Sequence, residues 1–317
     1  MKMQILKLMV ACAVLLGATA ALATDYAIEY GITIRPMVVY LSPDTTSAKL
    51  ATVDRGREMA VLGRTPGWVH VLATISTGVT GEGKDMSGWI LDKGLITKAT
   101  PLGDQIMFGE AADSEYQASI NNGRKGAAGD ARRLYYYVYE YFPQSPPAGE
   151  ALYRSADIRW QLDKADLESR PSAKANPGER LPIEERYMKL VMKKFPGTKW
   201  ADKAAFRLID NKLCGEWAAE AKCPLKEADV YLKYAKDYAN SPEAAEALYD
   251  AAWRYAALIE IYKANGEAKK APEAEQKALD LAQQVIAKNA GADWTTRAQR
   301  LIYMLQKKIS AYGNAVD

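Results

Sequence analysis

The chain has 317 residues, with 42 basic and 39 acidic side chains and a formal net charge of +3. So small a charge gives no field that would gather phosphates, which excludes nucleic acid as an expected partner. The apolar content of 49% supports folded cores rather than disorder, and the length suffices for two domains.

Residues 1–23 have the pattern of a secretory signal peptide. Lys2 and Lys7 precede an apolar run, and Ala21-Leu22-Ala23 forms a small-x-small cleavage site. Cleavage would leave 40 basic against 39 acidic side chains and no apolar run long enough to span a membrane. We therefore expect an exported protein that is periplasmic or associated with the envelope.

Cys12 raises an alternative, because a lipoprotein signal ends on a cysteine that is acylated after cleavage. Cleavage before Cys12 would leave the apolar run Ala13–Ala23 on the mature protein. This favours a cysteine that is removed together with the signal peptide.

Residues 24–98 are expected to form a small β domain. Strand-like segments follow one another at short spacing, as in a small barrel or sandwich. They are Thr33–Leu41 (with Pro36 at an edge or bulge), Lys49–Val53, Glu58–Gly63, Trp68–Val71 and Gly88–Leu91. Ser42-Pro43-Asp44 is a turn signal after the first of them.

The glycines and tryptophans of this region resemble those of the bacterial SH3 domain. Gly56 precedes Met59-Ala60-Val61-Leu62-Gly63, and the pairs Gly67-Trp68 and Gly88-Trp89 open later strands, as in that family. The segment Thr74–Ser87 is a longer hairpin than the family needs. The resemblance implies an SH3-like barrel that binds cell-wall peptides, glycans or proteins.

Trp68 and Trp89 allow two interpretations. Both could pack the barrel and support its turns, or one indole could form a surface platform for a peptide or a sugar, since Trp offers a large amphipathic contact. His70, the only histidine of the chain, alternates with Val69 and Val71 and is expected to point outward.

Beyond Leu102 the hydrophobic period becomes helical, and three segments have similar sequences. They are Phe142–Tyr153, Phe195–Phe206 and Tyr238–Tyr249, with a degenerate fourth near Asn289–Tyr303. In each, an aromatic residue is expected to end one helix, and Ser145, Thr198 or Ser241 to cap the next, with Pro146 and Pro242 at first helical positions. Ala151, Ala204 and Ala247 are small enough for close approach of neighbouring helices, and the aromatic residues two positions later fill the space between them.

This "Phe-Pro-x-Ser…Ala-Leu-Tyr" pattern resembles the tetratricopeptide-like domains of envelope assembly lipoproteins and of periplasmic cell-division coordinators. The resemblance covers roughly residues 110–310. It implies an all-α solenoid over residues 127–317 that binds proteins or peptides, with residues 99–126 as a linker and entry helix.

The tyrosine run that ends at Phe142 supplies the first candidate binding residues of the helical region. Leu134, Val138 and Tyr141 share one helix face, and Tyr135, Tyr139 and Phe142 share its neighbour, so these six are expected in the core. Tyr136 and Tyr137 fall partly outside this stripe and would line a peptide-binding groove if exposed. Trp253 and Tyr255 allow the same two interpretations.

Cys214 and Cys223 are predicted to form a disulfide, because an even pair in an exported protein favours one. On one continuous helix they would lie about 13 Å apart, which is too far to bridge. A turn must therefore separate them, with Cys223 capping a helix that begins at Pro224. Further metal ligands and CxxC redox spacing are both absent from this region.

The sequence gives little support for catalysis. One histidine is too few for a zinc amidase. A cysteine peptidase would need a free cysteine, whereas Cys214 and Cys223 are expected to be paired. The acidic residues lie at solvent-face spacing on the repeat helices, and Arg186, Lys189 and Lys193 form a basic face expected to be solvated. Gly123–Gly129 is expected to be a turn between helices.

The sequence therefore predicts a non-catalytic envelope adaptor without cofactor or metal. It would bind envelope proteins or peptides through the helical repeat, and a second protein or peptidoglycan through the SH3-like domain. One alternative is a cell-wall glycan-active enzyme with the SH3-like domain as its targeting module. Another is a mainly structural protein whose modules bind each other.

Overall fold

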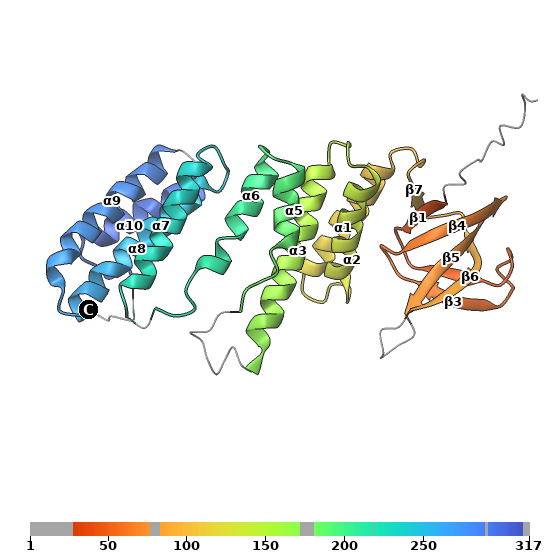
Figure 1. Ribbon diagram of the computed structural model, residues 1–317, viewed down its shortest axis with the longest axis horizontal. Coiled ribbons are helices and arrows are strands. Elements are labelled where there is room, and N and C mark those ends of the chain that lie inside the picture. The colour runs from red at the N-terminus through yellow and green to blue at the C-terminus, as the bar shows by residue number, and fades with distance from the viewer. Residues whose placement is uncertain (1–27, 77–82, 172–180, 218, 289–290, 313–317) are drawn as a thin grey trace, which may run out of the picture.

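The computed structural model describes residues 28–76, 83–171, 181–217, 219–288 and 291–312 (Figure 1). The expected signal peptide and Cys12 lie outside the described residues. An antiparallel sheet forms the N-terminal part, and the chain is helical after it. This confirms the expected order of a β region followed by an α region.

The described part of the sheet has seven strands in the order β3-β2-β6-β5-β4-β1-β7. They are β1 (Glu29–Thr33), β2 (Met37–Tyr40), β3 (Lys49–Val53), β4 (Glu58–Thr65), β5 (Trp68–Ser76), β6 (Gly83–Leu91) and β7 (Leu95–Thr97). The prediction of one strand over Thr33–Leu41 is wrong, because the chain leaves the sheet at residues 34–36. Pro36 cannot donate a ladder hydrogen bond, and the chain changes its pairing partners there: β1 pairs with β4 and β7, and β2 with β3 and β6.

Alternation along β5 separates the two faces of the sheet. Val69 and Val71 are fully buried and pack with Val39 and Ile90 in the core of the β region. His70, which lies between the two valines, points to the other face and is half-buried, as expected. The predicted turn after β2 is also present, and Asp44 accepts a hydrogen bond from the Thr46 backbone N–H at 2.9 Å.

The helices follow one another along the long axis of the molecule (Figure 1). They are α1 (Gly103–Ser119), α2 (Ala127–Tyr141), α3 (Ala148–Ser169), α5 (Arg186–Lys194), α6 (Lys199–Arg207), α7 (Lys222–Asp237), α8 (Ala244–Ala264), α9 (Ala271–Ala287) and α10 (Ala292–Gln306), with 3-10 turns at Asp210–Lys212 and Ala268–Lys270. Neighbours in sequence pack on each other, as in the pairs α1/α2, α2/α3, α7/α8 and α8/α9. The turn predicted over Gly123–Gly129 is present as far as Gly126, whereas Ala127 to Gly129 already belong to α2. No helix in the described ranges combines the length and the apolarity that crossing a membrane would require.

An identical corner ends α2, α5 and α7. Phe142, Phe195 and Tyr238 have φ of −130°, −129° and −121° and ψ of 57°, 52° and 48°. Each aromatic residue donates its backbone N–H to the carbonyl four residues before it, at 3.0, 2.9 and 2.9 Å. The predicted repeat of helix-ending aromatic residues is therefore present in the backbone itself.

The predicted N-caps are correct at one of the three corners. Thr198 caps α6 and accepts a hydrogen bond from the Ala201 N–H. The other two predictions are wrong, since α3 and α8 begin three residues after Ser145 and Ser241. There the serine carbonyl accepts a backbone N–H, from Ala148 at 3.0 Å and from Ala244 at 3.1 Å, and the Ser241 hydroxyl accepts the Glu243 N–H, which precedes the helix, at 3.1 Å. Pro146 and Pro242 lie in this tighter turn and not at the first position of the helix.

The small and aromatic residues of each repeat occupy the expected places. Ala151, Ala204 and Ala247 are fully buried. Two residues later, each aromatic ring contacts a ring of the next repeat: Tyr153 with Trp200 at 5.7 Å, Phe206 with Tyr234 at 5.1 Å and Tyr249 with Trp294 at 5.6 Å. These contacts join each repeat to its neighbour.

The β region and the first helices share one core. Ile32 and Ile96 of the sheet pack with Met107 of α1 and with Leu134 and Tyr141 of α2. Polar contacts surround this core: Tyr141 Oη donates to Glu58 at 2.7 Å, and Arg55 pairs with Glu110 at 2.6 Å. The segment 99–126, expected as a linker and entry helix, thus contributes α1 to the junction of the two regions.

Candidate functional site

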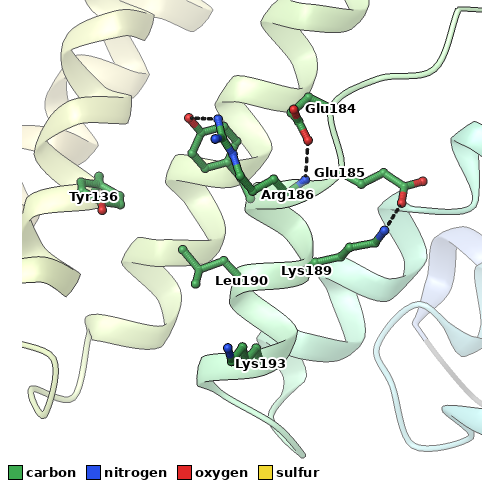
Figure 2. Close-up of a pocket in the computed structure, with 8 residues that line it drawn as sticks. Tyr136, Glu184, Glu185, Arg186, Lys189, Leu190 and Lys193 are labelled. Atoms are coloured by element: carbon green, nitrogen blue, oxygen red, sulfur yellow. Dashed lines mark hydrogen bonds and ion pairs between the residues drawn. The ribbon is translucent and has the colours of Figure 1, made fainter.

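A cleft of about 700 Å³ opens between α2 and α5 (Figure 2). Its lining combines aromatic, aliphatic and charged side chains. These are Tyr136 of α2 and Glu184, Glu185, Arg186, Tyr187, Lys189, Leu190 and Lys193 in and just before α5.

The position of the charged residues follows from the helical period of α5. Arg186, Lys189 and Lys193 recur at intervals of three and four residues and so share one face. The opposite face carries Met188 and Val191, which are fully buried. Burial of these two side chains fixes the rotation of α5 and thereby directs the basic face into the cleft.

Tyr136 forms the opposite wall. Its ring makes edge contacts with the rings of Tyr137 at 5.9 Å and Tyr139 at 6.3 Å. Burial, with a smaller effect of the Glu140 carboxylate, raises the pKa of Tyr136 to about 12. The hydroxyl is protonated at neutral pH and lies near the Glu140 carboxylate.

The charges of the cleft are only partly compensated. Lys189 pairs with Glu185 at 2.7 Å, and hydrogen bonds from Lys189 and Asn211 lower the pKa of that glutamate. Arg186 donates to the Tyr187 hydroxyl at 3.1 Å and lies over its ring at 4.9 Å. Lys193 has no ion-pair partner among the described residues. The cleft thus presents apolar surface together with an excess of positive charge.

Only part of this cleft could be predicted from the sequence. Tyr136 lines the cleft, whereas Tyr137 packs against Tyr141 at 5.8 Å beside the core. The basic face of α5 was expected to be solvated, and Arg186, Lys189 and Lys193 are exposed; the same face forms one wall of the cleft. The aromatic residue that opposes it belongs to the preceding repeat, a pairing that the helical period of α5 alone does not show.

Trp68 and Trp89 lie half-buried on the outer face of the sheet, apart from the core of the β region. Trp89 stacks on its cross-strand neighbour His70, with centroids 4.7 Å apart and planes at 16°. Trp68 meets Tyr40 edge-on at 5.6 Å. The two ring pairs lie on β2, β5 and β6, where Tyr40 is the strand partner of Trp89 and is itself buried.

Trp253 and Tyr255 have different surroundings. Tyr255 exposes 7% of its surface and belongs to the main helical core. Of its two interpretations, this agrees with core packing rather than with an exposed binding residue. Trp253 is half-buried and packs on Trp217 at 5.4 Å and on Tyr312 at 6.3 Å.

The predicted disulfide between Cys214 and Cys223 is confirmed, with Cα atoms 6.1 Å apart. The local prediction of the helix start is slightly wrong. α7 begins at Lys222, so Cys223 and Pro224 lie in its first turn and Ala221 is the cap residue. As expected, the chain turns between the two cysteines.

Acidic residues are not confined to solvent faces, which corrects the sequence interpretation. Glu227 of α7 exposes 2% of its surface and accepts hydrogen bonds from the Cys214 N–H at 2.9 Å and from Trp217 Nε1 at 3.1 Å. Its second oxygen pairs with Arg254 Nε of α8 at 3.1 Å. A carboxylate becomes acceptable inside the protein when another helix supplies the cation, and the sequence period of one helix cannot reveal that.

Two more carboxylates of α8 are partly withdrawn from water. Burial raises the pKa of Glu246 to about 7, with a further contribution from the neighbouring Asp250. Burial likewise raises the pKa of Asp250 to about 6, although Arg254 opposes this shift. Within the described ranges, no group of three or more His, Cys, Asp or Glu side chains could hold a metal ion.

No protein-family model matches the chain. No curated protein matches it either. Similar solved structures include the DHF119 filament, at 18% identity and a TM-score of 0.23, over 67% of this chain and 97% of that one. Another is the de novo designed helical repeat protein DHR64, at 18% identity and a TM-score of 0.21, over 65% and 94% of the two chains. At such TM-scores these similarities carry no argument about fold or function.

Proposed function

We propose that the protein is a non-catalytic adaptor of the bacterial envelope. In this proposal residues 1–23 direct export, the helices form a tetratricopeptide-like solenoid, and the sheet is an SH3-like barrel that binds a second protein or a cell-wall peptide or glycan. The cleft between α2 and α5 binds a segment of a partner protein, and it is the observation that carries the proposal.

The lining of the cleft supports a polypeptide ligand. Tyr136, Tyr187 and Leu190 offer apolar contacts, while Arg186 and Lys193 offer cationic donors at the margin. Such a combination favours a segment that carries both apolar and acidic side chains, because charge complementarity steers and orients it. The repeated corners and the buried alanines support the solenoid, since they are the features that stack repeat on repeat.

Site-specific photocrosslinking in intact cells tests the cleft. A photoreactive amino acid at Leu190 should trap a defined partner, and one at Tyr303, which is 56% exposed on α10, should not. The Leu190 product should disappear in the variant Lys193→Glu, because reversal of the charge repels an acidic segment. Equal products from Leu190 and Tyr303, or a product indifferent to Lys193→Glu, would contradict the proposal.

The Glu246 and Asp250 pair favours a second candidate, the glycan-active enzyme. Carboxylates with raised pKa values are typical of acid–base catalysis, although structural networks produce them as well. Incubation with purified sacculi distinguishes the two functions. Release of muropeptides by the protein, and its loss in Glu246→Gln, would replace the adaptor proposal with the enzyme; an adaptor releases none.

A further inference from the structure

A second, smaller cavity lies in the β region, whereas the α5 cleft lies in the helical region. Its volume is about 260 Å³. Val38, Tyr40 and Leu91 line it together with Pro36, Arg35 and Lys93. The exposed side chains of Arg35 and Lys93 belong to the two connections that flank β2 and β6.

The two cations of this cavity have no internal partners. The ion pairs of the described β region use Arg55 and Arg64, and Asp92, the nearest acid in the sequence, faces Arg64 at 3.5 Å. The Arg35 and Lys93 side chains take part in no ion pair or hydrogen bond of the described residues. Positive charge therefore stands uncompensated beside an apolar cavity.

The stem of Arg35 lies against the turn at Gly94. Gly94 has a φ of +87°, and a Cβ there would lie 3.2 Å from Arg35 Cγ and Nε. The missing side chain lets the arginine stem lie across the turn, and the Ile34 N–H bonds the Gly94 carbonyl at 2.9 Å. The exposed guanidinium can bind a carboxylate through two parallel hydrogen bonds.

We infer that this cavity binds the C-terminal residue of a partner protein, with the free α-carboxylate on Arg35 and Lys93 and an apolar side chain against Val38, Tyr40 and Leu91. The ligand class follows from charge complementarity and from size, because the cavity has room for a terminal residue but not for a folded element. This inference rests on one part of the proposed function, the binding of a second protein by the sheet region, and specifies the ligand; its failure would leave the proposal for the α5 cleft untouched.

Titration with short peptides, followed by NMR of the tryptophan indole N–H signals, tests this inference on the full protein. Trp68 contacts Tyr40 of the cavity, so its signal, assigned with Trp68→Phe, should shift; that of Trp294 in α10 should not. N-acetyl-L-Ala-L-Leu should bind about tenfold more tightly than its C-terminal amide, since the amide lacks the charge that strengthens the hydrogen bonds.

Three variants locate the effect. Arg35→Gln and Lys93→Gln should each weaken binding of the acid about threefold to tenfold, and Lys84→Gln, an exposed cation at the other end of β6, should not change it. Lys93 is exposed, so Lys93→Gln keeps the test decisive even if Arg35→Gln perturbs the turn. Equal binding of acid and amide, or no saturable shift, would overturn the inference. Tighter binding of N-acetyl-D-Ala-D-Ala would also overturn it and assign the cavity to a cell-wall stem peptide.

Discussion

Glu227 shows how a single side chain organises the loop that the disulfide closes. It receives the Cys214 N–H, the Trp217 indole and the Arg254 guanidinium, and it exposes 2% of its surface. Arg254 in turn lies over the rings of Tyr231 at 4.5 Å and Trp253 at 5.5 Å. The carboxylate thus joins α7, α8 and the loop before α7 through one point.

Replacement of this residue should be severe. Glu227→Ala would leave the nearly buried Arg254 with only its longer ion-pair contact to Asp250 at 3.4 Å and two N–H donors without an acceptor, and we expect a loss of about 3 kcal/mol in the free energy of unfolding. Asp229→Ala, at an exposed position of the same helix, should change it by less than about 0.5 kcal/mol. Urea denaturation measures both variants. Similar losses in the two would show that the network contributes nothing.

Glu246 should give the protein a pH-dependent stability. Burial raises its pKa from 4.5 to about 7, so the folded state binds the proton more tightly than the unfolded state does. Its contribution is therefore most favourable at low pH and is lost as the pH rises from about 4.5 to 7. Glu246→Gln should increase the free energy of unfolding by about 1–2 kcal/mol near pH 8, a value that allows for solvent screening, and should leave it unchanged near pH 4. Chemical denaturation at the two pH values measures the difference, and a constant effect of the substitution would contradict this assignment.

At the residue scale, features with local causes could be predicted from the sequence. The disulfide follows from a short spacing and a turn, and the outward position of His70 follows from the strand period. The buried Glu227 could not be predicted, since its partner Arg254 lies 27 residues later on another helix. The exposed basic face of α5 could be predicted, but not its place opposite Tyr136 in a cleft, because that tyrosine belongs to another helix.

The three repeated corners explain why the helices pack in register. Each corner places an alanine about one turn into the next helix, at a position that favours a small side chain. Ala151, Ala204 and Ala247 are all fully buried. The aromatic residues that end α2, α5 and α7 could be predicted, because Pro or Gly follows them. The exact starts of α3 and α8 could not, since a serine hydroxyl and a serine carbonyl compete there for the same first N–H groups.

The repeat alanines provide a test of this packing. Ala247→Leu should lower the free energy of unfolding by about 1–3 kcal/mol, because the added side chain has no space between α8 and its neighbours. Ala264→Leu, at the exposed end of the same helix, should have an effect below about 0.5 kcal/mol. Thermal and urea unfolding measure both substitutions. A well-tolerated leucine at position 247 would mean that the repeats do not approach each other closely.

At the scale of the whole molecule, the sheet and the helices are not independent units joined by a linker. One core contains Ile32 and Ile96 from the sheet together with Met107, Leu134 and Tyr141 from the helices. A fragment of residues 24–98 would expose this apolar face, so its isolated behaviour would not represent the protein. The sequence predicted two regions in the right order but not the shared core, because periodicity shows which face of an element is apolar and not which element covers it.

Hydrogen exchange can measure this coupling directly. Met107 is fully buried in the shared core, and Met107→Ala should lower the free energy of unfolding by about 2–5 kcal/mol. We expect faster amide exchange in α1 and α2 and also in β1 and β7, since both regions lose contacts when one residue at their junction is truncated. Leu258→Ala in α8, equally buried but in the distant helical core, should speed exchange among α7, α8 and α9 and leave the sheet unchanged. If Met107→Ala spares β1 and β7, the two regions move independently. If both respond, the cavity of the β region and the α5 cleft are carried on one continuous body, and a partner that engages both must match a fixed spacing.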